Sequence, residues 1–403
     1  MPESAFNVSD ILKISAVFVL ILILLRKKMN IGYVLLAASG ALALLYLMPP
    51  VSMASAVKAA FLDKVTIKLA LALTLIRIFE LILREKDVLS DMMTASRLLL
   101  RRKKAVVVSM PLLIGLLPSV GGAYFSAPMV EESAKGMNMS QEEKAFVNYW
   151  FRHPWEYILP LYPGLLLAAA VSNIELRNLI IANMPYAVFV AITGFMFSMK
   201  GASGRFSEAG NISRKGLFSF VPIAIALMLV VFFHIELHYA LLIMLPGLFI
   251  FYRFGLKDII RVVKRGLSFD VILLIAGIMI FKEIMESSGA VKNLSEFLRL
   301  NGIPAAPLLF MLPFVSGLLT GVTVGFVGSA FPLILSIAGE SSTVIISFAF
   351  ASGFLGVLLS PVHICLVLTR EYFKADMWGV YKKIIPAASV VFLVAVAEYL
   401  ILR

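Results

Sequence analysis

The chain has 403 residues, of which 61% are hydrophobic and only 15% are charged, and its formal net charge is +12. This composition, with many apolar runs near 20 residues, excludes an ordinary soluble domain and predicts an all-α polytopic membrane protein. The basic residues are spread over the loops between apolar runs, as the positive-inside rule describes. The expected surrounding is therefore a lipid bilayer, and no nucleic-acid partner is predicted.

In chain order, each half of the sequence predicts three membrane spans, a broken apolar segment and two more spans. The first half, 1–200, gives spans at about 11–25, 29–48 and 65–83, a broken segment at 106–134, and spans at 145–171 and 178–198. The second half, 201–403, gives spans at about 216–233, 238–252 and 266–286, a broken segment at 303–337, and spans at 341–368 and 384–402. Because five crossings is an odd number, the halves would insert in opposite orientations, which predicts inverted repeats with about ten transmembrane helices.

The first broken segment cannot cross the membrane as one helix. From Val106 to Leu117 a helix would rise about 18 Å, which is short of the roughly 30 Å hydrocarbon core. A cluster of proline, serine and glycine at 118–122 follows this apolar arm. Non-helical backbone at membrane depth is tolerated only where protein buries it or water reaches it. The pattern therefore predicts a re-entrant hairpin.

The second half repeats this pattern. Pro111 and Gly115-Leu-Leu align with Pro313 and Gly317-Leu-Leu. Ser126-Ala-Pro likewise aligns with Ser329-Ala-Phe-Pro, with two extra residues in the second copy, one before the serine and Phe331 before the proline. Paired broken segments in the two halves of a membrane chain are the sequence feature that best indicates a transporter's binding site.

The distribution of charge predicts the orientation of the chain. With the N-terminus outside, the expected cytoplasmic loops hold 25 of the 36 lysine and arginine residues. Cytoplasmic loops are the ones that carry excess Lys and Arg. We therefore expect a multi-pass protein of the cell membrane with both termini outside. The stretch 49–68 carries three lysines on the outer side, and an interfacial helix before the third span would account for them.

The hairpin tips are the first candidate site. Ser126 and Ser329 are placed like N-caps of the returning arms, with a proline in the first turn. A helix N-terminus attracts anions, and the preceding turns offer carbonyl oxygens to a cation. The substrate-binding residues predicted here are Ser119, Gly121, Gly122, Ser126, Thr320, Thr323 and Ser329. The ion-binding residues predicted here and at the later helix break are Pro118, Gly122, Thr320, Gly321 and Ser360. The alternative is a kinked packing site rich in small residues.

The span 145–171 supplies a second group of candidates. Asn148, Arg152 and Glu156 lie four residues apart and share one helix face. Charges inside a membrane are costly and usually face a polar cavity. Asn148 and Arg152 are therefore predicted to bind substrate, because a guanidinium binds a carboxylate through two hydrogen bonds. The alternative is a structural pair of Arg152 and Glu156.

The corresponding span of the second half contains Ser360-Pro361, followed by His363. His363 is predicted to bind substrate or move protons, and the alternative is a hydrogen-bonded packing residue. His234 and His238 have metal-like spacing, but they lie at an outer turn without a visible third ligand. No metal site and no cofactor is predicted, apart from sodium or a proton as the coupling ion.

Three stretches resemble a known family. GLLPSVGGAYFSAPMVEE, NYWFRHPWEYILPLYPG and SPVHICLVLTREYF are similar to the uncharacterised integral membrane family catalogued as domain of unknown function 401. That family is grouped with the ion transporter superfamily. The resemblance implies inverted repeats, two hairpins, a site near the midplane and a homodimer that works as an elevator. The tips differ from the Ser-Asn-Thr of the superfamily's dicarboxylate carriers, since they read Pro118-Ser-Val-Gly-Gly and Thr320-Gly-Val-Thr.

The sequence favours a secondary active transporter, not an enzyme, for a small anionic organic solute, coupled to sodium or protons. No G-x-x-x-x-G-K-[ST] motif is present, which argues against direct coupling to ATP. One alternative is an intramembrane hydrolase, because Gly201-Ala-Ser203-Gly resembles a serine nucleophile elbow. That tetrad lies in a basic loop. The other alternative is a passive channel.

Overall fold

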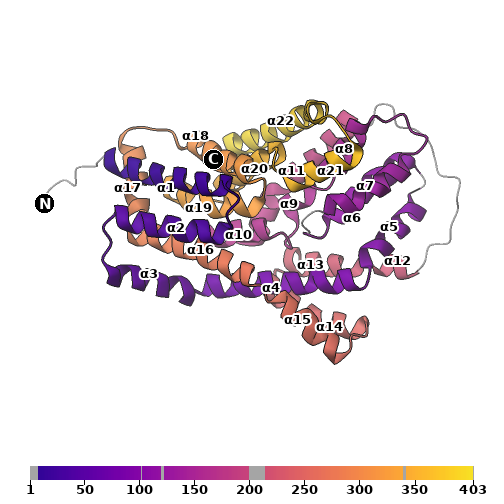
Figure 1. Ribbon diagram of the computed structural model, residues 1–403, viewed down its shortest axis with the longest axis horizontal. Coiled ribbons are helices and arrows are strands. Elements are labelled where there is room, and N and C mark those ends of the chain that lie inside the picture. Colours follow the sequence, from indigo (N-terminus) through magenta and orange to yellow (C-terminus); the bar gives the residue numbers. More distant parts are fainter. Residues whose placement is uncertain (1–7, 101, 119–121, 199–213, 339–341, 403) are drawn as a thin grey trace.

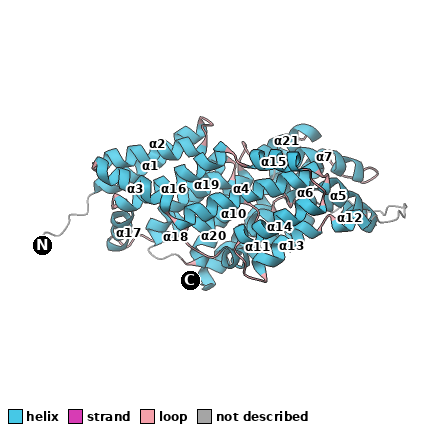
Figure 2. Ribbon diagram, turned by 90° about the horizontal axis from the view of Figure 1, so that it is seen from below, coloured by secondary structure: helices cyan, strands magenta, loops and turns pink. Residues whose placement is uncertain are grey.

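The computed structural model describes residues 8–100, 102–118, 122–198, 214–338 and 342–402. Among these residues the regular structure is helical and no β-strand is formed (Figure 2). The helices of the first half are α1 (Val8–Arg26), α2 (Ile31–Leu45), α3 (Pro50–Leu62), α4 (Lys64–Glu85), α5 (Val88–Leu99), α6 (Lys103–Gly115), α7 (Gly122–Ser133), α8 (Gln141–Trp150), α9 (Pro154–Ile158), α10 (Pro163–Val171) and α11 (Leu176–Ser198).

The second half continues with a similar series. Its helices are α12 (Arg214–Phe218), α13 (Val221–Val231), α14 (Leu237–Phe251), α15 (Leu256–Gly266), α16 (Phe269–Ser287), α17 (Ala290–Leu300), α18 (Ala305–Thr320), α19 (Thr323–Ala338), α20 (Thr343–Leu359), α21 (Ile364–Phe373) and α22 (Met377–Leu402). A helix was therefore predicted correctly at each expected span, and the stretch 49–68 contains α3 as a helix separate from α4.

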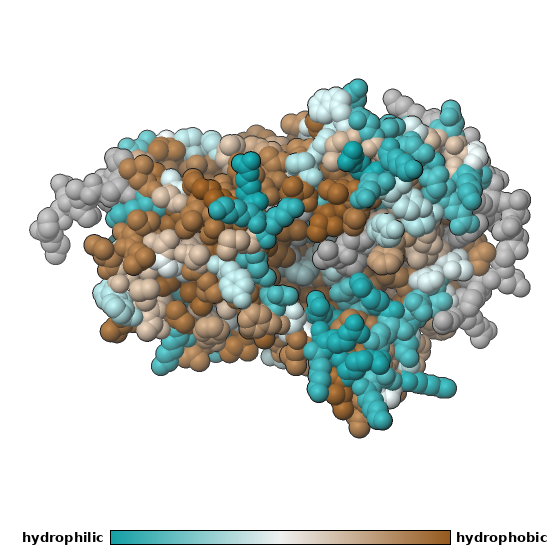
Figure 3. Space-filling model, viewed as in Figure 1, coloured by the Kyte–Doolittle hydropathy of each residue, from teal (hydrophilic) through white to brown (hydrophobic). Residues whose placement is uncertain are grey.

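Three segments of the described chain are long and apolar enough to cross a bilayer. They are Leu176–Ser198, Thr343–Phe373 and Met377–Leu402. Several shorter helices, such as α2 and α14, are also strongly apolar. Figure 3 shows hydrophobic residues over much of the visible face, whereas hydrophilic residues gather near α15 and around α8 and α21. The protein is a helical membrane protein.

At each predicted hairpin the structure has a pair of packed helices, and their re-entry into the membrane stays a prediction. The first consists of α6 and α7, and the second of α18 and α19. In Figure 1 the first pair lies in the right half of the molecule and the second in the left half, with α9 and α10 between them. The prediction that Ser126 and Ser329 cap the returning arms is wrong. The returning helices start earlier, at Gly122 and Thr323, so both serines and the following prolines lie in helix interiors.

The two spans that follow the hairpins are broken by proline. Pro154 and Pro163 each occupy the first turn of a new helix, so the span 145–171 is divided into α8, α9 and α10. A proline at this position has no N–H to leave unsatisfied and its φ suits a helix start. In the second half, α20 ends before Ser360-Pro361 and α21 begins after His363. Each span therefore has non-helical backbone in its interior, at 159–162 and 360–363.

The piece after each break packs against the hairpin of the other half. Helix α10 contacts α19, and α21 contacts α7. The first contact is close, because a Cβ added to Gly164 would lie 2.6 Å from the Thr323 Cβ. This exchange of partners brings the breaks and the hairpins together in the interior.

Candidate functional site

The candidate site lies where the hairpins meet the broken helices. At the first hairpin, Pro118 is half-buried and Gly122 is the buried first residue of α7. Ser119 and Gly121, which were predicted to bind substrate, lie outside the described residues. Aromatic side chains from the broken span hold the end of α6. Tyr162 donates to the Gly115 carbonyl oxygen at 2.6 Å, and the Trp155 indole donates to the Leu112 carbonyl oxygen at 2.7 Å.

Asn148 is the centre of a fully buried hydrogen-bond network. Its Oδ1 accepts from the Ser126 hydroxyl at 2.6 Å. Its Nδ2 donates to the Ala123 carbonyl oxygen at 2.9 Å and to the Thr369 Oγ1 at 3.0 Å. Asn148, Ser126 and Thr369 are all 0% exposed. One side chain of α8 thus connects the first hairpin to α21, which comes from the other half of the chain.

The second hairpin has a different internal network. Ser329 donates to the Gly325 carbonyl oxygen at 2.7 Å, and its hydroxyl also lies within hydrogen-bond distance of the Ser316 hydroxyl. Thr320 bonds the Ser316 carbonyl oxygen at 2.8 Å. Ser126 and Ser329 therefore belong to separate networks, each within or next to its own hairpin. Whether they flank one pocket stays a prediction.

The tip of the second hairpin is attached to the break in the last broken span. Gly321 ends α18 in the left-handed conformation, with φ 64°. Its carbonyl oxygen accepts from the His363 Nδ1 at 2.6 Å. The Ser360 hydroxyl donates to the Leu318 carbonyl oxygen at 2.7 Å. The predicted residues Thr320, Gly321, Ser360 and His363 are thus brought together, and Thr323 contacts Gly164 across the halves.

Arg152 and Glu156 interact with each other, and each also has a further partner that the sequence did not suggest. Arg152 is 3% exposed and its Nη1 donates to the Ile114 carbonyl oxygen of the first hairpin at 3.3 Å. The Glu156 Oε1 lies 3.8 Å from the His153 Nε2. The guanidinium therefore holds a hairpin arm, and the carboxylate faces a histidine that the sequence did not single out.

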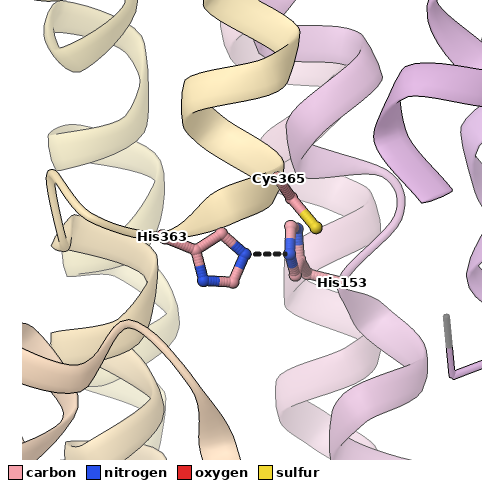
Figure 4. Close-up of side chains that lie close together, drawn as sticks. All are labelled: His153, His363 and Cys365. Carbon is pink, nitrogen blue, oxygen red and sulfur yellow. Dashed lines mark hydrogen bonds between the residues drawn. The ribbon is translucent and has the colours of Figure 1, made fainter. Parts of the chain in front are cut away.

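Three side chains from the two broken spans converge in the core (Figure 4). The Nε2 atoms of His153 and His363 lie 3.1 Å apart. The ligand atoms of both histidines and Cys365 all lie within 4.8 Å of one another, and the three residues are buried. His153 follows α8, His363 closes the break before α21, and Cys365 lies in the first turn of α21.

Sequence reasoning missed His153 and Cys365. One signal was available: each broken span carries a histidine within two residues of a proline, in His153-Pro154 and in Pro361-Val-His363. The chain's only cysteine follows the second histidine by two residues. The separation of 210 positions between the histidines hides their contact. Gly201-Ala-Ser203-Gly, the basis for the hydrolase alternative, lies outside the described residues.

The network as a whole has buried polar groups, helix ends and interrupted backbone from both halves. Such an arrangement can bind a small polar solute or an ion inside the membrane. No curated protein sequence matches the chain. A family model described as protein of unknown function (DUF401) matches residues 8–402, which is nearly the whole length. The chain therefore belongs to the DUF401 family.

Proposed function

We propose that the protein is a secondary active transporter of a small anionic organic solute, coupled to sodium or protons. The observation that carries this proposal is the contact between hairpins and helix breaks. The tip at Gly321 bonds the break at His363, and the arm end at Gly115 bonds Tyr162 of the other break. Interrupted helices buried in a membrane protein are typical of solute and ion sites in transporters.

The pattern of helix packing supports two inverted repeats and about ten spans. Most contacts of the first half have a counterpart with the halves exchanged. The contact of α10 with α19 corresponds to the contact of α21 with α7, and α2–α16 corresponds to α14–α4. In the same way, α3–α16 corresponds to α15–α4, α1–α2 to α13–α14, and α8–α22 to α20–α11. A two-fold relation between the halves would produce this exchange. This exchange favours a multi-pass protein of the ion transporter superfamily type. The resemblance to that superfamily adds the proposal that the protein moves as an elevator within a homodimer.

The charge of the solute is inferred from the groups around the tips. The returning helices α7 and α19 start in the interior, and a helix N-terminus carries a partial positive charge. Arg152 places a guanidinium next to the arm end of the first hairpin. A carboxylate solute would interact favourably with both. The coupling cation would bind carbonyl oxygens at the same turns.

The direct test is transport by purified protein in liposomes. We expect labelled organic acids to accumulate against their gradient when an inward sodium or proton gradient is imposed, and to leak out when an ionophore removes it. Gly321→Ala should abolish accumulation, because its Cβ would lie 2.9 Å from the His363 backbone. Gly302→Ala is the matched control, since Gly302 also has a positive φ of 60° but has nothing within 4 Å.

Other outcomes would replace the proposal. Flux that only equilibrates the solute would favour the passive channel, and bond cleavage without flux would favour the intramembrane hydrolase. Equal accumulation by Gly321→Ala and the unmodified protein would remove the hairpin tip from the transport path.

The proposed topology, with both termini outside, has its own test. Single cysteines at the exposed positions Lys257 and Lys374 should react with a membrane-impermeant maleimide only from the cytoplasm. Cysteines at exposed Lys58 and Asn301 should react only from outside. The unmodified protein is the control, because its Cys365 is buried. Labelling of position 257 in intact cells would contradict the topology.

A further inference from the structure

In the buried cluster, the hydrogen-bond partner of each histidine's Nδ1 fixes the protonation state of that atom. The His153 Nδ1 lies 2.6 Å from the Tyr149 carbonyl oxygen, and the His363 Nδ1 lies 2.6 Å from the Gly321 carbonyl oxygen. A carbonyl oxygen only accepts hydrogen bonds. Both Nδ1 atoms must therefore carry a hydrogen. In the neutral form each ring then has an unprotonated Nε2 with a lone pair.

The two atoms with these lone pairs lie next to each other. The Nε2 atoms are 3.1 Å apart, and His153 is 0% exposed while His363 is 6% exposed. Two acceptors at this distance repel unless a positive species lies between them. That species is either one shared proton or a metal ion. The bond from Nδ1–H to a backbone carbonyl is the usual support for a metal-ligating histidine, because it fixes both the tautomer and the ring orientation.

Cys365 favours the metal ion, and its sulfur also contacts the Arg152 guanidinium. Its Sγ lies within 4.8 Å of a ring nitrogen of each histidine, and a proton shared by two imidazoles needs no third ligand. Nitrogens bound about 2.0–2.1 Å from zinc in tetrahedral geometry are about 3.3 Å apart, close to the separation found here. The Glu156 Oε1 lies 3.8 Å from the His153 Nε2 and would have to move toward the other two side chains to take the fourth position.

The charges of this ligand set also suit a divalent ion. A thiolate, a carboxylate and two neutral imidazoles neutralise a dication, which reduces the cost of burying it. The Arg152 guanidinium, which contacts Cys365, then adds one positive charge beside the site. Binding would release the proton of the Cys365 thiol to solvent. A mixture of imidazole and thiolate ligands favours zinc and its relatives over magnesium or calcium, which take oxygen ligands.

We propose that His153, His363 and Cys365, with Glu156 at the fourth position, form a buried site for a divalent d-block ion such as zinc. The ion would join the two broken spans, since His153 belongs to the first and the other two ligands to the second. Through the bond from His363 to Gly321 it would also fix the tip of the second hairpin. The site stands independently of the transport activity proposed above.

The test uses the full-length protein in detergent. We expect one zinc per chain by elemental analysis of protein purified without chelator. After the zinc is removed, titrated cobalt should give tetrahedral d–d bands and a near-ultraviolet thiolate-to-cobalt charge-transfer band, both displaced by zinc. Cys365→Ser should lose the charge-transfer band, and His153→Gln should lower cobalt affinity at least tenfold.

His238→Gln is the matched control. His238 is also buried, at 5% exposed, but it faces Glu236 at 3.7 Å, away from the cluster. Its substitution should leave the cobalt spectrum unchanged. If His153→Gln does not fold, Cys365→Ser carries the test alone, because the charge-transfer band reports the bond between sulfur and cobalt. Folded protein with neither zinc nor cobalt bands would overturn the site, as would a charge-transfer band that persists in Cys365→Ser.

Discussion

Asn148→Leu is expected to abolish transport and to lower the free energy of unfolding by about 2–4 kcal/mol. Leucine has a similar size but leaves the Ser126 hydroxyl, the Ala123 carbonyl and the Thr369 hydroxyl without their shared partner. Hydrogen bonds between membrane helices contribute about 0.6 kcal/mol on average and up to about 1.7. A buried polar group left unpaired costs about 1–3 kcal/mol. Uptake into liposomes and unfolding in detergent measure the two effects.

Two further variants separate the network from general damage. Asn148→Asp keeps the shape, and its buried carboxyl stays neutral by binding a proton, so it retains an acceptor and one of the two donors, and we expect an intermediate loss of stability. Asn178→Leu replaces an exposed asparagine of α11 and should change neither quantity. If Asn148→Leu transports normally, the link between the first hairpin and α21 has no part in function.

The hairpins and the broken spans could be predicted because their signals are local. The proline, serine and glycine cluster after Leu117 ends an arm that is too short to cross, and Pro154 and Pro163 start new helices wherever the rest of the chain lies. The bounds of some helices, such as α4 and α11, also followed from the apolar runs, whereas α22 begins seven residues before the expected span and α5, α15 and α17 were not predicted. These features depend on backbone sterics and on the length of a helix, so they need no knowledge of the tertiary contacts.

The side-chain partners could not be predicted in the same way. Ser126 was predicted to be a helix cap, because serine before proline resembles a helix start. However, α7 begins four residues earlier, and the Ser126 hydroxyl donates a hydrogen bond to Asn148. The alternative that paired Glu156 with Arg152 assumed one continuous helix, whereas the chain turns at 151–153 and places the carboxylate beside His153 as well. Contacts between distant segments depend on packing that no local pattern encodes.

Close packing of the second hairpin against α20 depends on glycines that the sequence alone did not distinguish. Gly317 of α18 lies so near Gly353 of α20 that an added Cβ would overlap the Gly353 carbonyl oxygen. Gly356 of α20 is in the same position toward the Phe314 carbonyl oxygen. Small residues allow membrane helices to approach closely, and this approach replaces the hydrophobic effect as a source of stability between helices. The hairpin can therefore stay against α20 only while these positions have no side chain.

Gly317→Ala is accordingly expected to lower the free energy of unfolding by about 1–3 kcal/mol or more, since the overlapping atom is rigid backbone and the helices must separate. Gly247→Ala is the matched control, because Gly247 also lies inside an apolar helix but has nothing within 4 Å of an added Cβ. There alanine should raise stability by about 0.5–1 kcal/mol, the usual gain for replacing glycine within a helix. Unfolding of both variants in the same detergent compares the two. An equal gain at both positions would show that α18 and α20 do not pack as closely as the structure has them.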